Sequence, residues 1–427
     1  MVPKLLELNV GLYLLVFIGT FLPLLFIFRK QYWNLFDPLI LLLFSLAFNV
    51  SIAAYTYLTG DMQGRFMVYI LICMVAFVAG FFSYVRYKEP AVPPLQNDVV
   101  FTGPDRFMTT ALIVTNILFI TINNLFLLYS VGLGILTGDV NPDLAKVTLS
   151  QGGAGIFQKV AWISKFIIVP LCAHAFYMFR MKKLVLFTLA YFVFSSMVFS
   201  FSKSGLLFML FDFSIVAYYY NRYLGMKLIN FGKMFVFAGI GGGAALIVLL
   251  NVTSKYGVSI SELLAERFIA TGSGTYQFFS MDGYRAFANF DFVTRIQNYL
   301  DVILSTFKLK AWEPLGYMAY MTEYLTGLNA PGFGANPYLF VDGYFLFGWG
   351  GILYCFVLGL LLRTVRSMKT GYLRFFIFNT IVPQLFADPG IVQHSIIALL
   401  LFVPVYLLIK VVADIYHKQT TITLARI

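Results

Sequence analysis

Runs of about twenty apolar residues recur along this chain and limit its possible folds more than any other feature, because a helix of that length crosses a hydrocarbon core of roughly 30 Å. The runs are continuous, whereas the strands of a transmembrane barrel alternate polar and apolar residues. The chain is 60% hydrophobic and only 11% charged, and soluble domains are about 25% charged. We therefore predict an all-α polytopic membrane protein.

We predict about eleven spans (ten to twelve) in one membrane domain, residues 1–427. They lie close to residues 10–28, 36–58, 66–85, 108–130, 157–178, 184–201, 205–220, 232–252, 339–362, 375–387 and 396–414. Lys and Arg gather in alternate connections and at the C-terminal end, which marks these as cytoplasmic. The N-terminus and residues 131–156, 253–338 and 388–395 are then external.

The net charge of +11 follows from this cytoplasmic excess of basic residues, so we expect no nucleic-acid partner. The three cysteines all fall inside apolar runs, as small buried residues do. None of the three histidines has the spacing of zinc ligands. We therefore expect neither a metal nor a cofactor. The residues concerned are Cys73, Cys172, Cys355, His174, His394 and His417.

A polar stretch from Thr253 to Phe340 is the longest connection between apolar runs, and we interpret it as the active site. A capping box at Ser259–Glu262 predicts a helix through Ala270. Apolar residues at helical spacing predict a second helix over Asp291–Phe307, lying along the membrane. Acidic and basic residues nearly cancel in this stretch, so any anion binding must come from particular arginines.

Four cations are candidates to bind such an anion: Lys203, Arg267, Arg285 and Arg295. A guanidinium group binds two phosphate oxygens at once. Each cation also has a structural interpretation. Arg267 could reach lipid headgroups or a helix C-terminus, Lys203 and Arg285 could extend to the headgroup region, and Arg295 could pair with Asp291 four residues earlier.

Asp342 lies a few residues inside a predicted span, and a carboxylate at that depth is a functional candidate. It could alternatively pair with Lys203 or an arginine, or cap a broken helix. The glycines at 348, 350 and 351, together with Asn336 and Tyr344, fit a bent or closely packed entry to that span. His394 ends a turn between spans, where it could be structural or could exchange a proton.

Three segments make the chain resemble the O-antigen polymerase family (Wzy type), the membrane enzymes that polymerise oligosaccharide repeat units in bacteria. They are Phe201-Ser-Lys-Ser-Gly205, then Glu266-Arg-Phe followed by Gly272-Ser-Gly-Thr-Tyr276, and Gly334-Ala-Asn-Pro continuing through Asp342-Gly-Tyr-Phe-Leu-Phe-Gly-Trp-Gly-Gly351. The large external loop extends the similarity. Glu266 stands where the family often has the first of two arginines, so Arg267 lacks its usual neighbour.

The resemblance implies a multi-span (GT-C-like) glycosyltransferase in the bacterial inner membrane. It would extend undecaprenyl-pyrophosphate-linked glycans at the periplasmic face, with lipid-linked donor and acceptor as partners. The resemblance leaves a chain-length regulator protein open as a further partner. Cations must stabilise the leaving pyrophosphate, and a carboxylate must accept the proton of the acceptor hydroxyl. We assign pyrophosphate binding to Arg267, Arg285, Lys203 and Arg295, catalysis to Asp342, Glu266 and Glu323, and sugar binding to Tyr276, Asn336, Tyr338, Tyr344 and His394.

Two other functions stay open. An O-antigen ligase would use the same donor with a lipid A-core acceptor, and the sequence barely separates it from a polymerase. A flippase or other transporter of lipid-linked oligosaccharide would be expected to have repeated halves and charges in several spans. Polar groups collect here on one face and no repeat is visible, which favours an enzyme.

Overall fold

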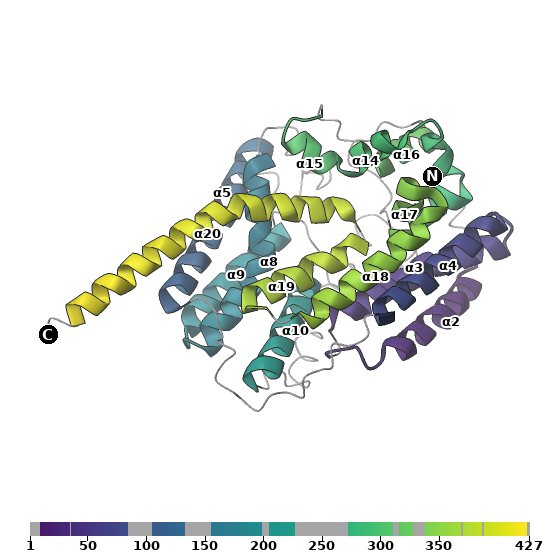
Figure 1. The fold of residues 1–427 in the computed structure, drawn as a ribbon. Helices are drawn as coiled ribbons and strands as arrows, with labels where there is room; N and C mark the ends of the chain where they lie inside the picture. Colours follow the sequence, from purple (N-terminus) through teal and green to yellow (C-terminus); the bar gives the residue numbers. More distant parts are fainter. Residues whose placement is uncertain are drawn as a thin grey trace. The chain divides into compact units, whose positions relative to one another are not determined.

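The computed structural model of the chain describes residues 9–34, 36–83, 105–132, 155–198, 205–226, 272–310, 316–327, 338–368, 370–386 and 388–424. Throughout these ranges the regular structure is helical and contains no strand, as predicted (Figure 1). The chain divides into two compact units, each assembled from three separate segments. We describe each unit by itself.

The first unit comprises residues 1–94, 230–368 and 381–393. Its long helices are α2 (Val10–Phe28), α3 (Pro38–Leu58), α4 (Gly64–Ser83) and α18 (Gly351–Ser367). Its shorter elements are α13 (Ser273–Thr275), η1 (Tyr276–Ser280), η2 (Gly283–Phe287), α14 (Phe292–Tyr299), α15 (Asp301–Thr306), α16 (Tyr317–Thr326), α17 (Leu339–Phe347), η3 (Gly348–Gly350) and η4 (Val382–Phe386).

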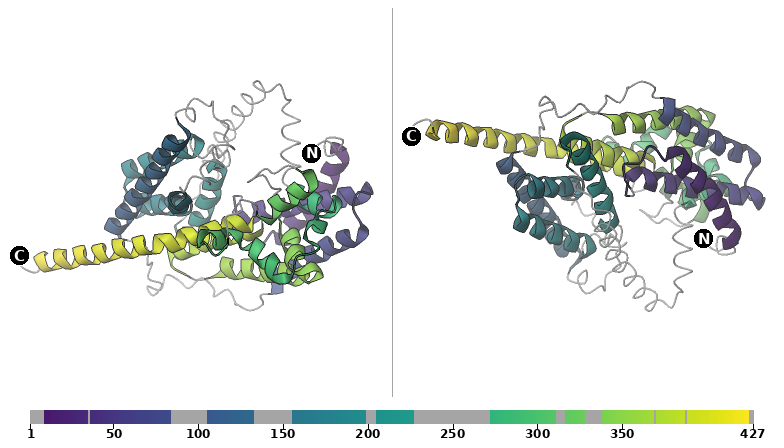
Figure 2. Two further views of the ribbon diagram at one scale, coloured as in Figure 1. Left: turned by 90° about the horizontal axis from the view of Figure 1, so that it is seen from above. Right: turned by 90° about the horizontal axis from the view of Figure 1, so that it is seen from below.

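The second unit comprises residues 95–229, 369–380 and 394–427. It contains α5 (Arg106–Val131), α8 (Gly155–Tyr177), α9 (Lys182–Val198), α10 (Gly205–Leu224) and nearly all of α19 (Tyr372–Ile381). The last helix, α20 (Pro389–Leu424), begins in the first unit and continues into the second as one uninterrupted helix (Figure 2).

Six helical segments within the described ranges are long and apolar enough to cross a membrane. They are Gly11–Phe28, Pro38–Leu58, Gly64–Ser83, Arg106–Tyr129, Leu339–Ser367 and Pro389–Tyr416. The predicted spans in the regions of α8, α9, α10 and α19 also coincide with helices, and α8 contains a shorter apolar stretch, Phe166–Tyr177. The span predicted at 232–252 lies outside the described residues.

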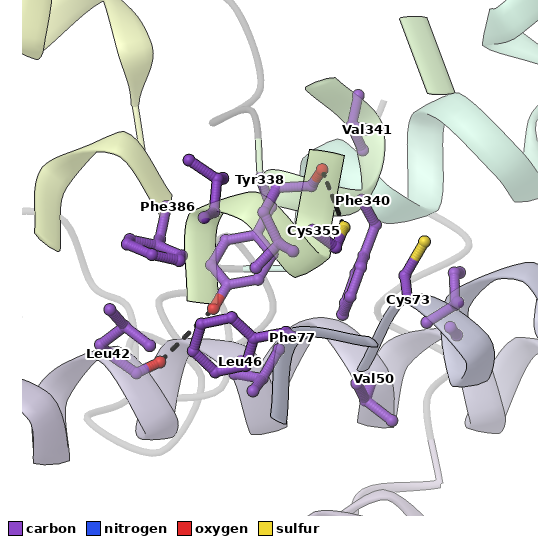
Figure 3. Packing of buried hydrophobic residues seen from close by; sticks show 14 of the residues in the cluster. Leu42, Leu46, Val50, Cys73, Phe77, Tyr338, Phe340, Val341, Cys355 and Phe386 are labelled. Carbon is purple, nitrogen blue, oxygen red and sulfur yellow. Dashed lines mark hydrogen bonds between the residues drawn. The ribbon is translucent and has the colours of Figure 1, made fainter. Parts of the chain in front are cut away.

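Helices α4 and α18 pack closely against each other in the first unit. A methyl group added at Gly359 would lie 2.2 Å from the carbonyl oxygen of Phe77, and one at Gly80 would lie 2.0 Å from that of Phe356. Small residues at such crossings let helix backbones approach closely. Around the crossing, Cys73, Phe77 and Cys355 belong to a large buried apolar cluster that also includes residues of α3 and α17 (Figure 3).

The span that carries Asp342 is bent, as its glycines predicted. Helix α17 ends at Phe347, and Gly348 follows with φ of 58°, a left-handed conformation that glycine adopts readily. The single turn η3 then leads into α18. A methyl group at Gly351 would lie 2.2 Å from the hydroxyl oxygen of Tyr69, so close packing and the bend occur together.

Candidate active site

The polar stretch folds onto the beginning of α17. We refer to its described residues, 272–310 and 316–327, as the cap; they lie above α17 in Figure 1. In the cap, η1 packs against α3, α16 against η2, and α14 against α17. The helix predicted over Asp291–Phe307 is present as α14 and α15 with an interruption at Leu300, and Asp291 caps it. The helix predicted from Ser259 lies outside the described residues.

Asp342, in the first turn of α17, is completely buried beneath the cap, with 0% of its surface exposed. The hydroxyl of Tyr317, on α16, donates a hydrogen bond to its Oδ1 atom. Its Oδ2 atom is buried and has no hydrogen-bond partner among the described residues. The Tyr317 ring stacks on Phe345 with 4.3 Å between ring centroids, which holds the phenol over the carboxyl group. Natively buried polar atoms without partners are uncommon, so Asp342 is a strong candidate for a functional group.

Two further phenols adjoin this carboxyl group. The hydroxyls of Tyr299, at the end of α14, and Tyr354, in α18, lie 3.1 Å apart. Burial, followed by the charge of Asp342, raises the pKa of Tyr299. The backbone carbonyl of Tyr299 accepts a hydrogen bond from the side-chain amide of Gln393, near the start of α20. The cap is thus fastened by hydroxyl and amide contacts around Asp342.

Arg295 fastens the cap to α17. Its guanidinium group donates to three backbone carbonyls: that of Phe345 at 2.8 Å, that of Phe290 at 3.1 Å and that of Phe287 at 3.2 Å. The carbonyl of Phe345 is available because α17 ends two residues later. The ion pair expected between Arg295 and Asp291 is absent, because the guanidinium group is directed to these carbonyls; Asp291 accepts from the Thr294 amide at 2.7 Å. Arg295 therefore has a structural role in this conformation.

Arg285, in contrast, is on the surface of the cap, with 58% of its side chain exposed. It pairs with Asp282 at 2.8 Å, and its guanidinium carbon lies 6.0 Å from the ring centre of Tyr284. A second arginine reaches the same tyrosine: Nη2 of Arg65, at the start of α4, lies 3.3 Å from the Tyr284 hydroxyl oxygen. Sequence patterns did not single out Arg65, although the predicted topology puts it on the external side, next to the cap.

The tyrosines predicted to bind sugars are less accessible than Arg285. Tyr338 is 3% exposed, and its hydroxyl donates to the Leu42 carbonyl inside the apolar cluster (Figure 3). Tyr276 is buried against Tyr13, Phe48, Ile52 and Tyr55. Tyr344 is half-buried and makes an edge contact with Tyr69 at 5.1 Å. In this conformation Tyr338 and Tyr276 pack as apolar residues, because their rings fill spaces between helices.

The remaining candidates are dispersed. Glu323 is half-buried on α16, the helix that carries Tyr317. His394 belongs to the second unit, where its ring centre lies 6.1 Å from that of Trp162. Lys203, Glu266, Arg267 and Asn336 lie outside the described residues. Within the described ranges, no group of three His, Cys, Asp or Glu side chains is arranged to hold a metal ion.

Sequence reasoning identified Asp342 but missed its partner Tyr317, which stands 25 positions away on a different helix. It also missed Tyr320 and Tyr324, two tyrosines exposed on α16. Their spacing of four residues on a helix was a usable signal, because it puts both rings on one face.

Comparison with known proteins identified no similar protein: no family model, curated protein or solved structure matches this chain.

Proposed function

We propose that the protein is a glycosyltransferase that polymerises undecaprenyl-pyrophosphate-linked repeat units into O-antigen or a related surface polysaccharide. The reaction would take place at the periplasmic face of the bacterial inner membrane. The observation that carries the proposal is the buried carboxyl group of Asp342, with one oxygen unpartnered, beneath a cap whose surface carries arginine. The three segments that resemble O-antigen polymerases support it, and Asp342 belongs to one of them.

The chemistry requires one base and at least one cation. The oxygen of the acceptor hydroxyl forms a bond to the anomeric carbon of the donor while the bond from that carbon to the pyrophosphate oxygen breaks. The base takes the hydroxyl proton, and the departing polyprenyl pyrophosphate needs positive charge nearby. Arg285 is exposed for that second role. Asp342 takes the first role once Tyr317 and α16 move aside, because the carboxyl group is fully covered otherwise.

Glu323 is the alternative base. It lies on α16 and is half-buried, so an acceptor could approach it without movement of the cap. The two carboxyl groups are distinguished by substitution: Asp342→Asn and Glu323→Gln each preserve size and remove the base. If Asp342 is the base, its substitution lowers transfer by at least about 100-fold, whereas Glu323→Gln retains most of it.

A second candidate function is transport of a lipid-linked oligosaccharide. The observation that favours it is again Asp342, since an incompletely bonded carboxyl group inside a candidate span is also typical of proton-coupled transporters. A ligase, with a lipid A-core acceptor, is the third possibility and would use the same donor site as the polymerase.

The decisive experiment reconstitutes the purified protein in liposomes with a lipid-linked repeat unit. A polymerase joins repeat units and lengthens the glycan. A ligase transfers the glycan without lengthening it, and only when lipid A-core is supplied as acceptor. A transporter moves the lipid-linked unit between leaflets and forms no new bond. Asp414→Asn is the matched control, because Asp414 is an exposed aspartate in α20. In a deletion strain, lipopolysaccharide with single-unit caps supports a polymerase, and lipopolysaccharide without caps indicates a ligase.

A further inference from the structure

Arg65 and Arg285 come from distant parts of the sequence and both lie next to Tyr284. Arg65 donates to the Tyr284 hydroxyl, 219 positions away in sequence, and Arg285 lies beside the ring of the same tyrosine. Both arginines are exposed. Arg65 makes no ion pair with any described residue, and Arg285 has one acidic partner, Asp282. Two guanidinium groups therefore face solvent with most of their N–H groups available.

The position of this cluster indicates which anion could reach it. Arg65 is the second residue of the candidate span Gly64–Ser83, so its guanidinium group stands at the boundary between apolar and polar surroundings. The next residue, Phe66, is fully buried, and its ring centre lies 5.0 Å from that of Tyr284. Lipid phosphates occupy this depth in a bilayer, and arginine binds phosphate oxygens with two parallel hydrogen bonds.

The adjoining surface is also of the kind found at a membrane boundary. Tyr324 is 56% exposed on α16, the helix that packs against η2, and η2 contains Arg285. Tyr320, one turn earlier on the same helix, is 40% exposed. Tyrosines with an apolar ring and a polar hydroxyl are enriched at membrane–water interfaces. The arginine cluster is thus bordered by aromatic side chains that suit contact with a lipid.

We propose that Arg65, Tyr284 and Arg285 form a binding site for the phosphate group of a lipid. In this site Arg65 and Arg285 both bind phosphate oxygens, and the Tyr284 hydroxyl can donate a further hydrogen bond. The incoming phosphate displaces the carboxylate of Asp282 from Arg285. If the proposed glycosyl transfer is correct, the natural occupant is the pyrophosphate of the polyprenyl donor, and that identification rests on the proposed function. The phosphate site itself does not.

The test measures binding without catalysis. The intact protein is placed in nanodiscs of phosphatidylcholine, which carries no net charge, and titrated with farnesyl pyrophosphate as a short polyprenyl probe. We expect Arg65→Ala and Arg285→Ala each to weaken binding by at least about tenfold, the usual effect of losing one charge-assisted hydrogen bond. Tyr284→Phe, which keeps the ring, should weaken it by less. Arg106→Ala is the matched control, because Arg106 is an exposed arginine at the start of another candidate span.

A second arm replaces the probe by phosphatidylglycerol in the nanodisc and measures thermal stability. Stabilisation that disappears in the Arg65→Ala/Arg285→Ala double variant, without binding of the pyrophosphate probe, supports the phosphate site and identifies a lipid headgroup as its occupant. Equal responses of the wild type and the folded double variant to both ligands overturn the site. If the probe binds through both arginines but the protein does not extend glycans, the phosphate site is supported and only the proposed glycosyltransferase activity is contradicted.

Discussion

Two fully buried aspartates in the first unit have opposite surroundings. Asp37, just before α3, accepts four hydrogen bonds: from the amides of Trp33 and Leu39 at 2.7 and 2.8 Å, and from both terminal nitrogens of Arg366 at 2.8 and 2.7 Å. Arg366 in turn packs on the Trp33 ring, 4.0 Å from its centre. Asp342 has a single donor, Tyr317, and one oxygen without a partner among the described residues.

The difference separates a structural carboxylate from a functional candidate. Asp37 is completely paired by a cation and backbone amides, which is how a protein tolerates a buried charge. Asp342 stands near the start, and Arg366 near the end, of the same candidate span, Leu339–Ser367. At one end of this span, Arg366 is fully paired with Asp37. At the other end, the Oδ2 atom of Asp342 has no hydrogen-bond partner among the described residues. Four predictions test this contrast, from the largest expected effect to the smallest.

Removing one partner of the Asp37–Arg366 pair should have the largest effect. Asp37→Ala leaves a buried guanidinium group without its counter-ion, which destabilises proteins by about 3–5 kcal/mol. Thermal unfolding in detergent and the yield of folded protein measure the loss. The double variant Asp37→Ala/Arg366→Met should recover part of it, because no uncompensated charge then remains. A single variant as stable as the wild type would contradict the structural role.

The packing of α4 against α18 provides the next test. Gly359→Ala should destabilise the protein by about 1–3 kcal/mol, because the added methyl group meets the Phe77 carbonyl and forces the helices apart. Gly19→Ala, in α2, is the matched control: apart from its chain neighbours and the nearby backbone of its own helix, no described atom lies within 4 Å of the added carbon, so a neutral or slightly stabilising change is expected. Unfolding curves of the two variants that coincide would show that α4 and α18 do not pack this closely.

Substitutions at Tyr317 and Asp342 should affect stability and activity separately. Tyr317→Phe removes the only described donor to the carboxyl group and should cost about 1–3 kcal/mol. Asp342→Asn can still accept from Tyr317, so it should change stability by less than that while abolishing glycan extension. The two measurements are a melting curve and the liposome assay on the same preparation. An active Asp342→Asn variant would exclude this carboxyl group as the base.

The smallest effect concerns Asp388, a partly buried carboxyl group that is bonded only through backbone amides among the described residues. Burial raises the pKa of Asp388 above its ordinary value of 3.8. The folded state therefore holds this proton more tightly than the unfolded state, and its stabilising contribution is present at low pH and lost as pH rises through the folded pKa. Asp388→Asn should flatten the fall in stability above pH 3.8. An unchanged pH profile would rule out this contribution.

The sequence alone located most of the long helices among the described residues, because an apolar run long enough to cross a bilayer is stable there only as a helix or in a closed barrel. It also predicted the helix over Asp291–Phe307, from apolar residues at helical spacing, and the glycine bend before α18, because both patterns involve neighbouring residues. The local pattern further pointed to Asp342, a carboxyl group in an otherwise apolar stretch. These features are short-range, so they can be found by inspecting a few consecutive residues.

The tertiary structure decided what each polar side chain contacts. Arg366, which follows the span predicted at 339–362, is buried against Asp37, 329 positions away. Arg295 binds carbonyls rather than Asp291, and Tyr338 packs in the core. Arg65 meets Tyr284 only because α4 and the cap come together. Partner choice depends on which distant elements are brought within about 3 Å, and hydropathy carries no information about that distance.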